Sequence, residues 1–171
     1  HNIDHTIDVV EACEMIGRAC NLNKEELEIA ILAGWFHDTG YYLGNESHES
    51  ESAAIAEKFL RQKRVPARTL SMIRQAILAT KIPQSPRTLV DKVLCDADLY
   101  HLSSSSFFEK SELLRREISY CKTHISPTAW LRITLDFLSQ HHYHTAFAKK
   151  ILHPQKETIR NTLQSKVKGS P

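Results

Sequence analysis

Glycine, proline and cysteine are scarce in this sequence, and each scarcity narrows the choice of fold. The 171 residues include only five Gly and six Pro, so few positions favour the tight turns that join short strands. The four cysteines form no Cys-x-x-Cys pair and lack the spacing of a small secreted disulfide framework. They are Cys13, Cys20, Cys95 and Cys121. We interpret them as reduced thiols and expect a cytoplasmic protein.

Long apolar runs and a strong charge of one sign are also missing. No stretch approaches the roughly 20 apolar residues that cross a bilayer. The formal net charge of +2 is too small to argue for a nucleic acid or a membrane surface as a partner. The length is that of one ordinary domain. The sequence opens on His1 inside a motif, so we expect further residues upstream, and the oligomeric state is not predicted.

Helical periodicity is what the sequence does contain, with apolar residues at i, i+3 and i+4 spacings. Seven helices are predicted over residues 4–20, 24–36, 48–62, 66–81, 87–102, 107–124 and 127–140. Asn23, Ser47 and Ser126 are their clearest N-caps. An eighth helix after Thr145 is expected to break near Pro154, and about the last 15 residues to fray. No strand pattern, linker or repeat is visible, so we predict one all-α domain over residues 1–171.

His37 and Asp38 stand side by side at the end of an apolar run, residues 29–36, that is typical of a buried helix. Burying an ionised carboxylate costs several kcal/mol unless it is paired. Adjacent helical residues point about 100° apart, so both side chains reach one point only where the helix ends. Gly40 is expected to end it by adopting a positive φ. The alternative is a capping aspartate beside a histidine bonded to a backbone carbonyl.

Two further polar pairs interrupt predicted helices. His1 and His5 are four residues apart and share a helix face, and Asp96 and Asp98 lie in an otherwise apolar segment. Each pair alone is also explained by exposed or capping side chains. Together with the His–Asp doublet, they form a mixed nitrogen and oxygen set from three helices. Such a set suits Zn, Mn, Fe, Co or Ni better than calcium, and the cation would neutralise the buried acids.

The order of these residues resembles the HD-domain superfamily of metal-dependent phosphohydrolases. HNIDHTIDVV is similar to the opening of cyclic-nucleotide phosphodiesterases, WFHDTGY to the signature doublet, and VLCDADL to the last acidic motif. HESESAAIAEKFL and ILATK are similar to the helices between them. FLSQHHYHTAFAKKI is similar to a C-terminal stretch of small bacterial HD phosphohydrolases. The resemblance covers nearly the whole chain and implies one HD-domain bundle of seven or eight helices.

The resemblance also implies the metal ligands. These are His5, His37, Asp38 and one aspartate of the pair Asp96 and Asp98. Asp98 follows alanine, as is usual in the superfamily, whereas Asp96 fits if cysteine replaces that alanine. With Asp98 as the ligand, Asp96 would orient a ligand histidine or a water. No further histidine pair lies between Glu49 and Arg87. The resemblance therefore favours one ion of Mn, Fe, Zn, Co or Ni, or of Mg, and two ions remain the alternative.

Catalytic roles follow from the same resemblance. His1 would protonate a leaving oxygen. His48 would contact phosphate or a second metal, helped by Glu49 and Glu51. Lys81 would hold a phosphate oxygen, although a lysine after a helix is also commonly solvated. The implied reaction is hydrolysis of a phosphate ester or anhydride, in a nucleotide or small phosphorylated metabolite, by a metal-activated water.

Two other functions stay open from the sequence. A metal-holding HD module could sense a nucleotide without hydrolysing it, and thermal shifts without product would favour that reading. A di-iron oxygenase on the same scaffold would need more ligands than the sequence offers. His141, His142 and His144 form an additional candidate metal patch, but their spacing beside Tyr143 favours a helix end.

Overall fold

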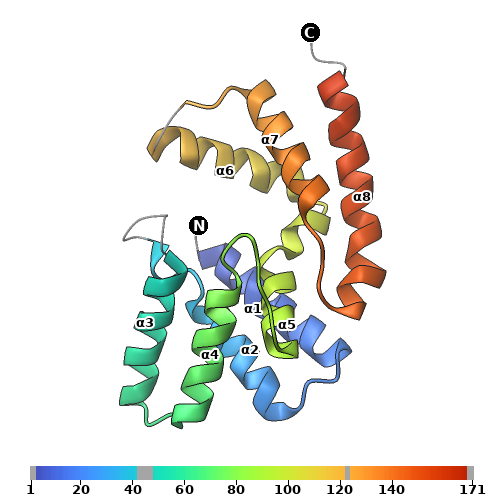
Figure 1. Cartoon of the computed structure of the whole chain (residues 1–171). Coiled ribbons are helices and arrows are strands. Elements are labelled where there is room, and N and C mark those ends of the chain that lie inside the picture. Colours follow the sequence, from blue (N-terminus) through green and yellow to red (C-terminus); the bar gives the residue numbers. More distant parts are fainter. Residues whose placement is uncertain (1–2, 42–47, 122–123, 169–171) are drawn as a thin grey trace. The chain divides into compact units, whose positions relative to one another are not determined.

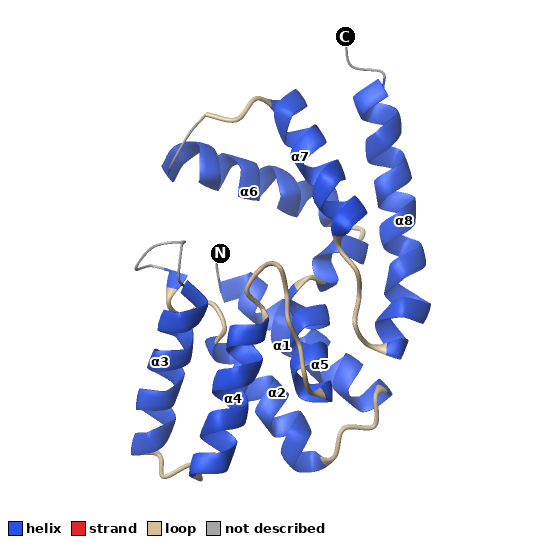
Figure 2. Cartoon of the chain, in the orientation of Figure 1, coloured by secondary structure: helices blue, strands red, loops and turns tan. Residues whose placement is uncertain are grey.

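The computed structural model describes residues 3–41, 48–121 and 124–168, and these ranges contain α-helices and no strand (Figures 1 and 2). The helices are α1 (Ile3–Ala19), α2 (Lys24–Phe36), α3 (His48–Gln62), α4 (Ala67–Ala79), α5 (Leu89–Asp98), α6 (Phe107–Cys121), α7 (Pro127–Gln140) and α8 (Ala146–Lys168). A short 3₁₀ helix, η2 (Tyr100–Ser103), follows α5. The prediction of an all-α fold is confirmed. The predicted fifth helix over 87–102 is instead divided between α5 and η2.

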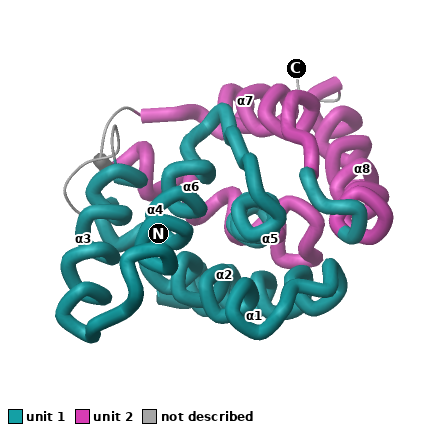
Figure 3. Tube along the Cα trace, turned by 60° about the horizontal axis from the view of Figure 1, so that its bottom comes forward, with its two compact units in different colours: residues 1–99, 144–147 teal, residues 100–143, 148–171 magenta. Residues whose placement is uncertain are grey.

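The chain divides into two compact units (Figure 3). The first comprises residues 1–99 and 144–147, and the second residues 100–143 and 148–171. Within the first unit, α1 packs on α2 and α5, and α3 packs on α4. The single domain over residues 1–171 stays a prediction. None of the described helices is both long and apolar enough to cross a membrane.

Two predicted N-caps begin their helices as expected. The Asn23 side chain accepts a hydrogen bond from the Glu26 amide, and the Glu26 carboxylate accepts one from the Asn23 amide, each at 3.0 Å. This reciprocal pair satisfies two amides that a helix start leaves without partners. The Ser126 hydroxyl accepts from the Ala129 amide at 3.2 Å and begins α7. Ser47 lies outside the described residues.

Helix α8 continues through Pro154, so the predicted break there is wrong. Proline removes one backbone hydrogen bond, which is tolerable where the freed carbonyl faces water. Pro154 is exposed, whereas Leu152 and Lys156 on either side of it are buried. Burial of these neighbours therefore outweighs the local preference. The helix reaches Lys168 with Leu163 buried, so most of the segment expected to fray is helical.

Small residues bring α1 and α2 close together in the first unit. A Cβ atom on Gly34 would lie 3.4 Å from both Cys13 Sγ and a methyl carbon of Val10. Ala30 and Ala33 on the same helix are fully buried, but Trp35 is 42% exposed. The run 29–36 is therefore buried on one face rather than throughout. This close packing sets the end of α2 beside the start of α1.

Candidate metal centre

The turn after α2 places His37 and Asp38 at a helix end, as predicted. The helix stops at Phe36, and residues 37–40 form consecutive turns. The Thr39 amide and hydroxyl both donate to the Phe36 carbonyl, at 3.0 and 2.8 Å. These bonds satisfy a carbonyl that the helix would otherwise leave without a partner. The doublet therefore begins where the helix ends, and His37 itself keeps right-handed helical dihedral angles.

Gly40 is required in this turn for space and not for a positive φ, so the expected backbone conformation was wrong. A Cβ atom at this position would lie 2.6 Å from Glu51 Cβ, from the His48 carbonyl oxygen and from the Ser52 nitrogen. The Gly40 amide donates to Ser52 Oγ at 2.8 Å. Glycine therefore lets the turn lie directly against the first turns of α3.

His37 is held in one orientation by its own helix. The ring is only 1% exposed, and Nδ1–H donates to the Gly34 carbonyl at 2.7 Å. That bond leaves Nε2 as the atom that faces the neighbouring histidine and carboxylates. The alternative of a histidine bonded to a backbone carbonyl is confirmed for His37, but the Gly34 carbonyl was not singled out as the acceptor from the sequence. The signal was available, because the last four carbonyls of a helix lack intrahelical donors.

Side chains from α1, the α2 turn and α5 meet around this nitrogen. His37 Nε2 lies 3.4 Å from His5 Nε2, 3.4 Å from Asp38 Oδ2 and 3.5 Å from Asp98 Oδ1. His5 Nε2 lies 3.5 Å from the same Asp38 oxygen and 3.4 Å from the same Asp98 oxygen. His5, His37 and Asp98 offer donor atoms that all lie within 4.8 Å of one another. No other group of three or more such side chains occurs within the described ranges.

These separations suit ligands of one ion better than hydrogen bonds. An N–H···O hydrogen bond spans about 2.7–3.2 Å. Two donor atoms about 2.1 Å from one ion, at angles of about 90–109°, lie about 3.0–3.4 Å apart. The set combines imidazole nitrogen with carboxylate oxygen, which suits a divalent transition metal. The residues present therefore fit a divalent ion, whose identity the donor set does not fix.

The charges around His37 also favour a bound cation. Burial alone lowers the pKa of His37, but the carboxylates of Asp38 and Asp98 outweigh burial and raise it to about 10. Burial raises the pKa of Asp98, yet His37 and His5 outweigh it and hold that pKa well below its usual range. The same two carboxylates that favour a proton on His37 would favour a divalent cation, which binds the deprotonated ring nitrogen.

Asp98 and Asp96 have different surroundings. The structure places Asp98 beside the histidines, whereas the two oxygens of Asp96 accept hydrogen bonds from the amides of His144 and Thr145, at 2.7 and 2.8 Å. Asp96 is fully buried. Burial raises its pKa, and the two amide hydrogen bonds oppose that shift. Asp96 thus anchors the segment that leads into α8.

His48 lies on the other side of Asp38. Its Nε2 is 3.6 Å from Asp38 Oδ1 and 3.6 Å from Glu49 Oε1. Asp38 therefore turns one oxygen toward His5 and His37 and the other toward His48. Glu49 is buried to 7% exposure, so it belongs to this cluster.

Three candidates from the sequence remain. Lys81 and Glu51 are exposed, and His1 lies outside the described residues. Roles for these three residues stay predictions.

His141, from the additional candidate metal patch, packs between aromatic rings, with centroids 6.2 Å from Phe137 and 4.7 Å from Tyr143. His144, from the same candidate patch, contacts Gln84 Oε1 through Nε2 at 3.0 Å.

Fold and site together define an all-helical protein with a candidate divalent-metal centre at converging helix ends. The family model of the HD domain matches residues 2–103, more than half of the chain. The chain therefore belongs to the HD-domain family, whose members are generally metal-dependent hydrolases. No curated protein and no solved structure matches the chain.

Proposed function

We propose that this protein is a phosphohydrolase that cleaves a phosphate ester or anhydride in a nucleotide or another small phosphorylated metabolite. The observation that carries the proposal is the approach of five atom pairs to 3.4–3.5 Å among His5, His37, Asp38 and Asp98. Membership of the HD-domain family supports metal-dependent hydrolysis of phosphates as the reaction class. Neither a nucleic acid nor a membrane is part of the proposal.

The side chains divide the proposed work by their positions. His5, His37, Asp38 and Asp98 would hold the ion, and the bond from His37 to the Gly34 carbonyl fixes the direction in which Nε2 points. A bound divalent ion supplies a Lewis acid for a phosphoryl oxygen and lowers the pKa of a water to about 7. The side chains of Asp38 and Asp98 are mostly out of solvent. This burial strengthens their interaction with a cation.

His48 has the position required of a phosphate contact. It stands beside Asp38 at the first residue of α3 and is 20% exposed at its side chain, so a substrate can reach it. A ring N–H of His48 would donate to a phosphate oxygen while Asp38 and Glu49 hold the ring. We propose one ion as the working state. A second ion would need His48 and Glu49 as ligands, and metal stoichiometry distinguishes these two cases.

The test combines metal analysis with a panel of phosphoesters and nucleotides. Wild-type protein is expected to retain one divalent ion per chain and to release phosphate or a nucleoside product from at least one compound. Asp98→Asn should lose both properties, because it removes the charge of one ligand. Asp136→Asn is the matched control, since Asp136 is exposed on α7 in the second unit.

Three results would contradict the proposal or redirect it. Wild-type protein that binds no ion and hydrolyses nothing on the panel would refute it. Equal losses of ion binding and hydrolysis in Asp98→Asn and Asp136→Asn would show that the ion is not held at the assigned site. Retention of the ion with nucleotide-dependent thermal shifts and no product would instead support a regulatory nucleotide-binding module.

A further inference from the structure

Positive charge is concentrated in one segment of the first unit. Residues 52–90 contain eight Lys or Arg residues and a single acidic residue, Glu57, for a net charge of +7. Because the whole chain carries +2, the remaining residues together carry −5. The segment comprises most of α3, all of α4 and the loop that follows. A local field of this kind attracts anions even when the total charge is small.

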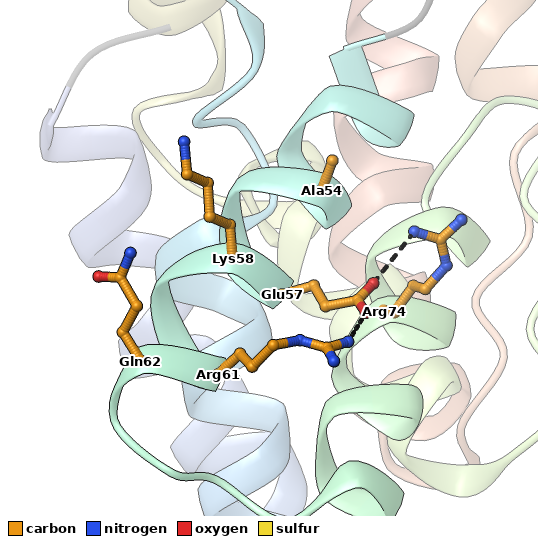
Figure 4. A pocket seen from close by; sticks show the side chains of 6 residues that line it. All are labelled: Ala54, Glu57, Lys58, Arg61, Gln62 and Arg74. Carbon is orange, nitrogen blue, oxygen red and sulfur yellow. Dashed lines mark hydrogen bonds and ion pairs between the residues drawn. The ribbon is translucent and has the colours of Figure 1, made fainter.

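A hollow of about 580 Å³ lies on this segment, where α3 and α4 pack side by side (Figure 4). Its volume is within the range of about 300–1,000 Å³ that small-molecule sites occupy. The side chains that line it are Ala54, Glu57, Lys58, Arg61, Gln62 and Arg74. Three of these are cationic and one is anionic. The hollow is therefore lined mainly by donors of positive charge.

Glu57 holds the two arginines of the hollow in place. Its carboxylate lies 2.5 Å from a terminal nitrogen of Arg61 and 3.6 Å from one of Arg74, and Figure 4 shows these side chains reaching it from α3 and α4. A guanidinium group carries five N–H donors in a planar fork. Contact with one carboxylate leaves donors on both arginines that can face a ligand. Such forks bind phosphate oxygens in pairs.

A second hollow extends the basic surface. It has a volume of about 280 Å³ and shares Arg74 with the first. Arg87 and the hydroxyls of Ser71 and Ser85 are among its lining groups. The two hollows therefore place Lys58, Arg61, Arg74 and Arg87 along one surface. A ligand with several phosphate groups in a row matches this arrangement better than a single phosphate does.

We propose that this surface binds the phosphate chain of a small polyphosphate, either a nucleoside triphosphate or an inorganic polyphosphate, at a site separate from the metal centre. None of the residues proposed to hold the ion lines either hollow. His48 begins α3, and Ala54, the first lining residue along that helix, lies about 9 Å farther along its axis. The site thus adds a binding function that the proposed hydrolysis does not require.

The test measures binding with the metal centre kept free of ions by EDTA. Inorganic tripolyphosphate is titrated calorimetrically into the full chain at low ionic strength. Arg61→Gln combined with Arg74→Gln should weaken binding at least about tenfold, because both guanidinium forks are lost. Arg64→Gln combined with Arg68→Gln is the matched control. These two exposed cations lie in the same segment but do not line the hollows, so affinity should change by less than about twofold.

Each outcome of this experiment decides the proposal. Absence of tripolyphosphate binding by wild-type protein, or an equal loss in both double variants, would overturn it. Lys58→Glu provides a second test that leaves both arginines in place, and unchanged affinity in that variant would also count against the site. Adenosine triphosphate in a parallel titration separates the two ligand sources. Tighter binding of the nucleotide indicates a nucleoside triphosphate site, and equal binding indicates recognition of the phosphate chain alone.

Discussion

Gly40→Ala should destabilise the protein far more than an ordinary surface substitution. The new Cβ would lie 2.6 Å from three atoms of α3, and two of these, the His48 oxygen and the Ser52 nitrogen, belong to the backbone. Rotation of a side chain cannot relieve such contacts. Overpacking of this kind costs about 1–3 kcal/mol, and distorting the Gly40 hydrogen bond to Ser52 adds about 0.5–1.5 kcal/mol. We expect a total loss of about 1.5–4.5 kcal/mol.

Urea unfolding at constant pH measures this loss, and ion affinity measures its effect on the site. Because the same turn carries Asp38, displacing it from α3 should weaken ion binding as well. Ser52→Ala removes only the hydrogen bond and should cost about 1 kcal/mol. Gly34→Ala is the matched control, since its Cβ would make ordinary 3.4 Å contacts and alanine favours the helix by about 1 kcal/mol. A Gly40→Ala protein as stable as Gly34→Ala would refute the assigned close approach.

Three further predictions follow from buried groups and helix chemistry. Asp96→Asn should lower stability by about 1–3 kcal/mol, since an amide group would face a backbone N–H. Metal content should stay unchanged, and a lost ion would contradict the assignment of Asp96 as the anchor of the segment before α8. Burial lowers the pKa of Lys156 below 10.5, so the unfolded chain binds more protons, and stability should rise with pH between the lowered pKa and 10.5. Lys156→Met should abolish that rise in urea titrations. Pro154→Ala should stabilise α8 by about 1–2 kcal/mol in thermal unfolding, because Pro154 is exposed and alanine restores a helical hydrogen bond.

Features governed by local chemistry were predictable from the sequence. Asn23 and Ser126 cap their helices because a short polar side chain reaches a nearby amide without help from the rest of the fold. The end of α2 at the His–Asp doublet was predictable for a similar reason. A buried acid beside an apolar run requires either a partner or a helix end. Asp38 lies at the end of α2 and also has His5 and His37 beside it.

Features governed by packing were not predictable in the same way. Asp96 and Asp98 are two residues apart, so they face different sides of α5, and only the position of α1 and α2 decides which side meets the histidines. Gly40 illustrates a second ambiguity, since glycine serves equally for a positive φ and for close approach. Burial on both sides of Pro154 overrode its local preference. The basic surface on α3 and α4 was not predictable from the net charge of +2, because that value sums regions of opposite charge.

The hydrogen bond between His37 and the Gly34 carbonyl has a consequence for mutational tolerance. Every amino acid carries that carbonyl, so no side-chain replacement at position 34 deletes the acceptor. The orientation of the ring is therefore encoded by helical geometry over four consecutive residues, and no second side chain has to change in step with His37. Saturation mutagenesis should find position 34 limited by the room beside Val10 and Cys13, whereas position 37 should accept no other residue where ion binding is selected.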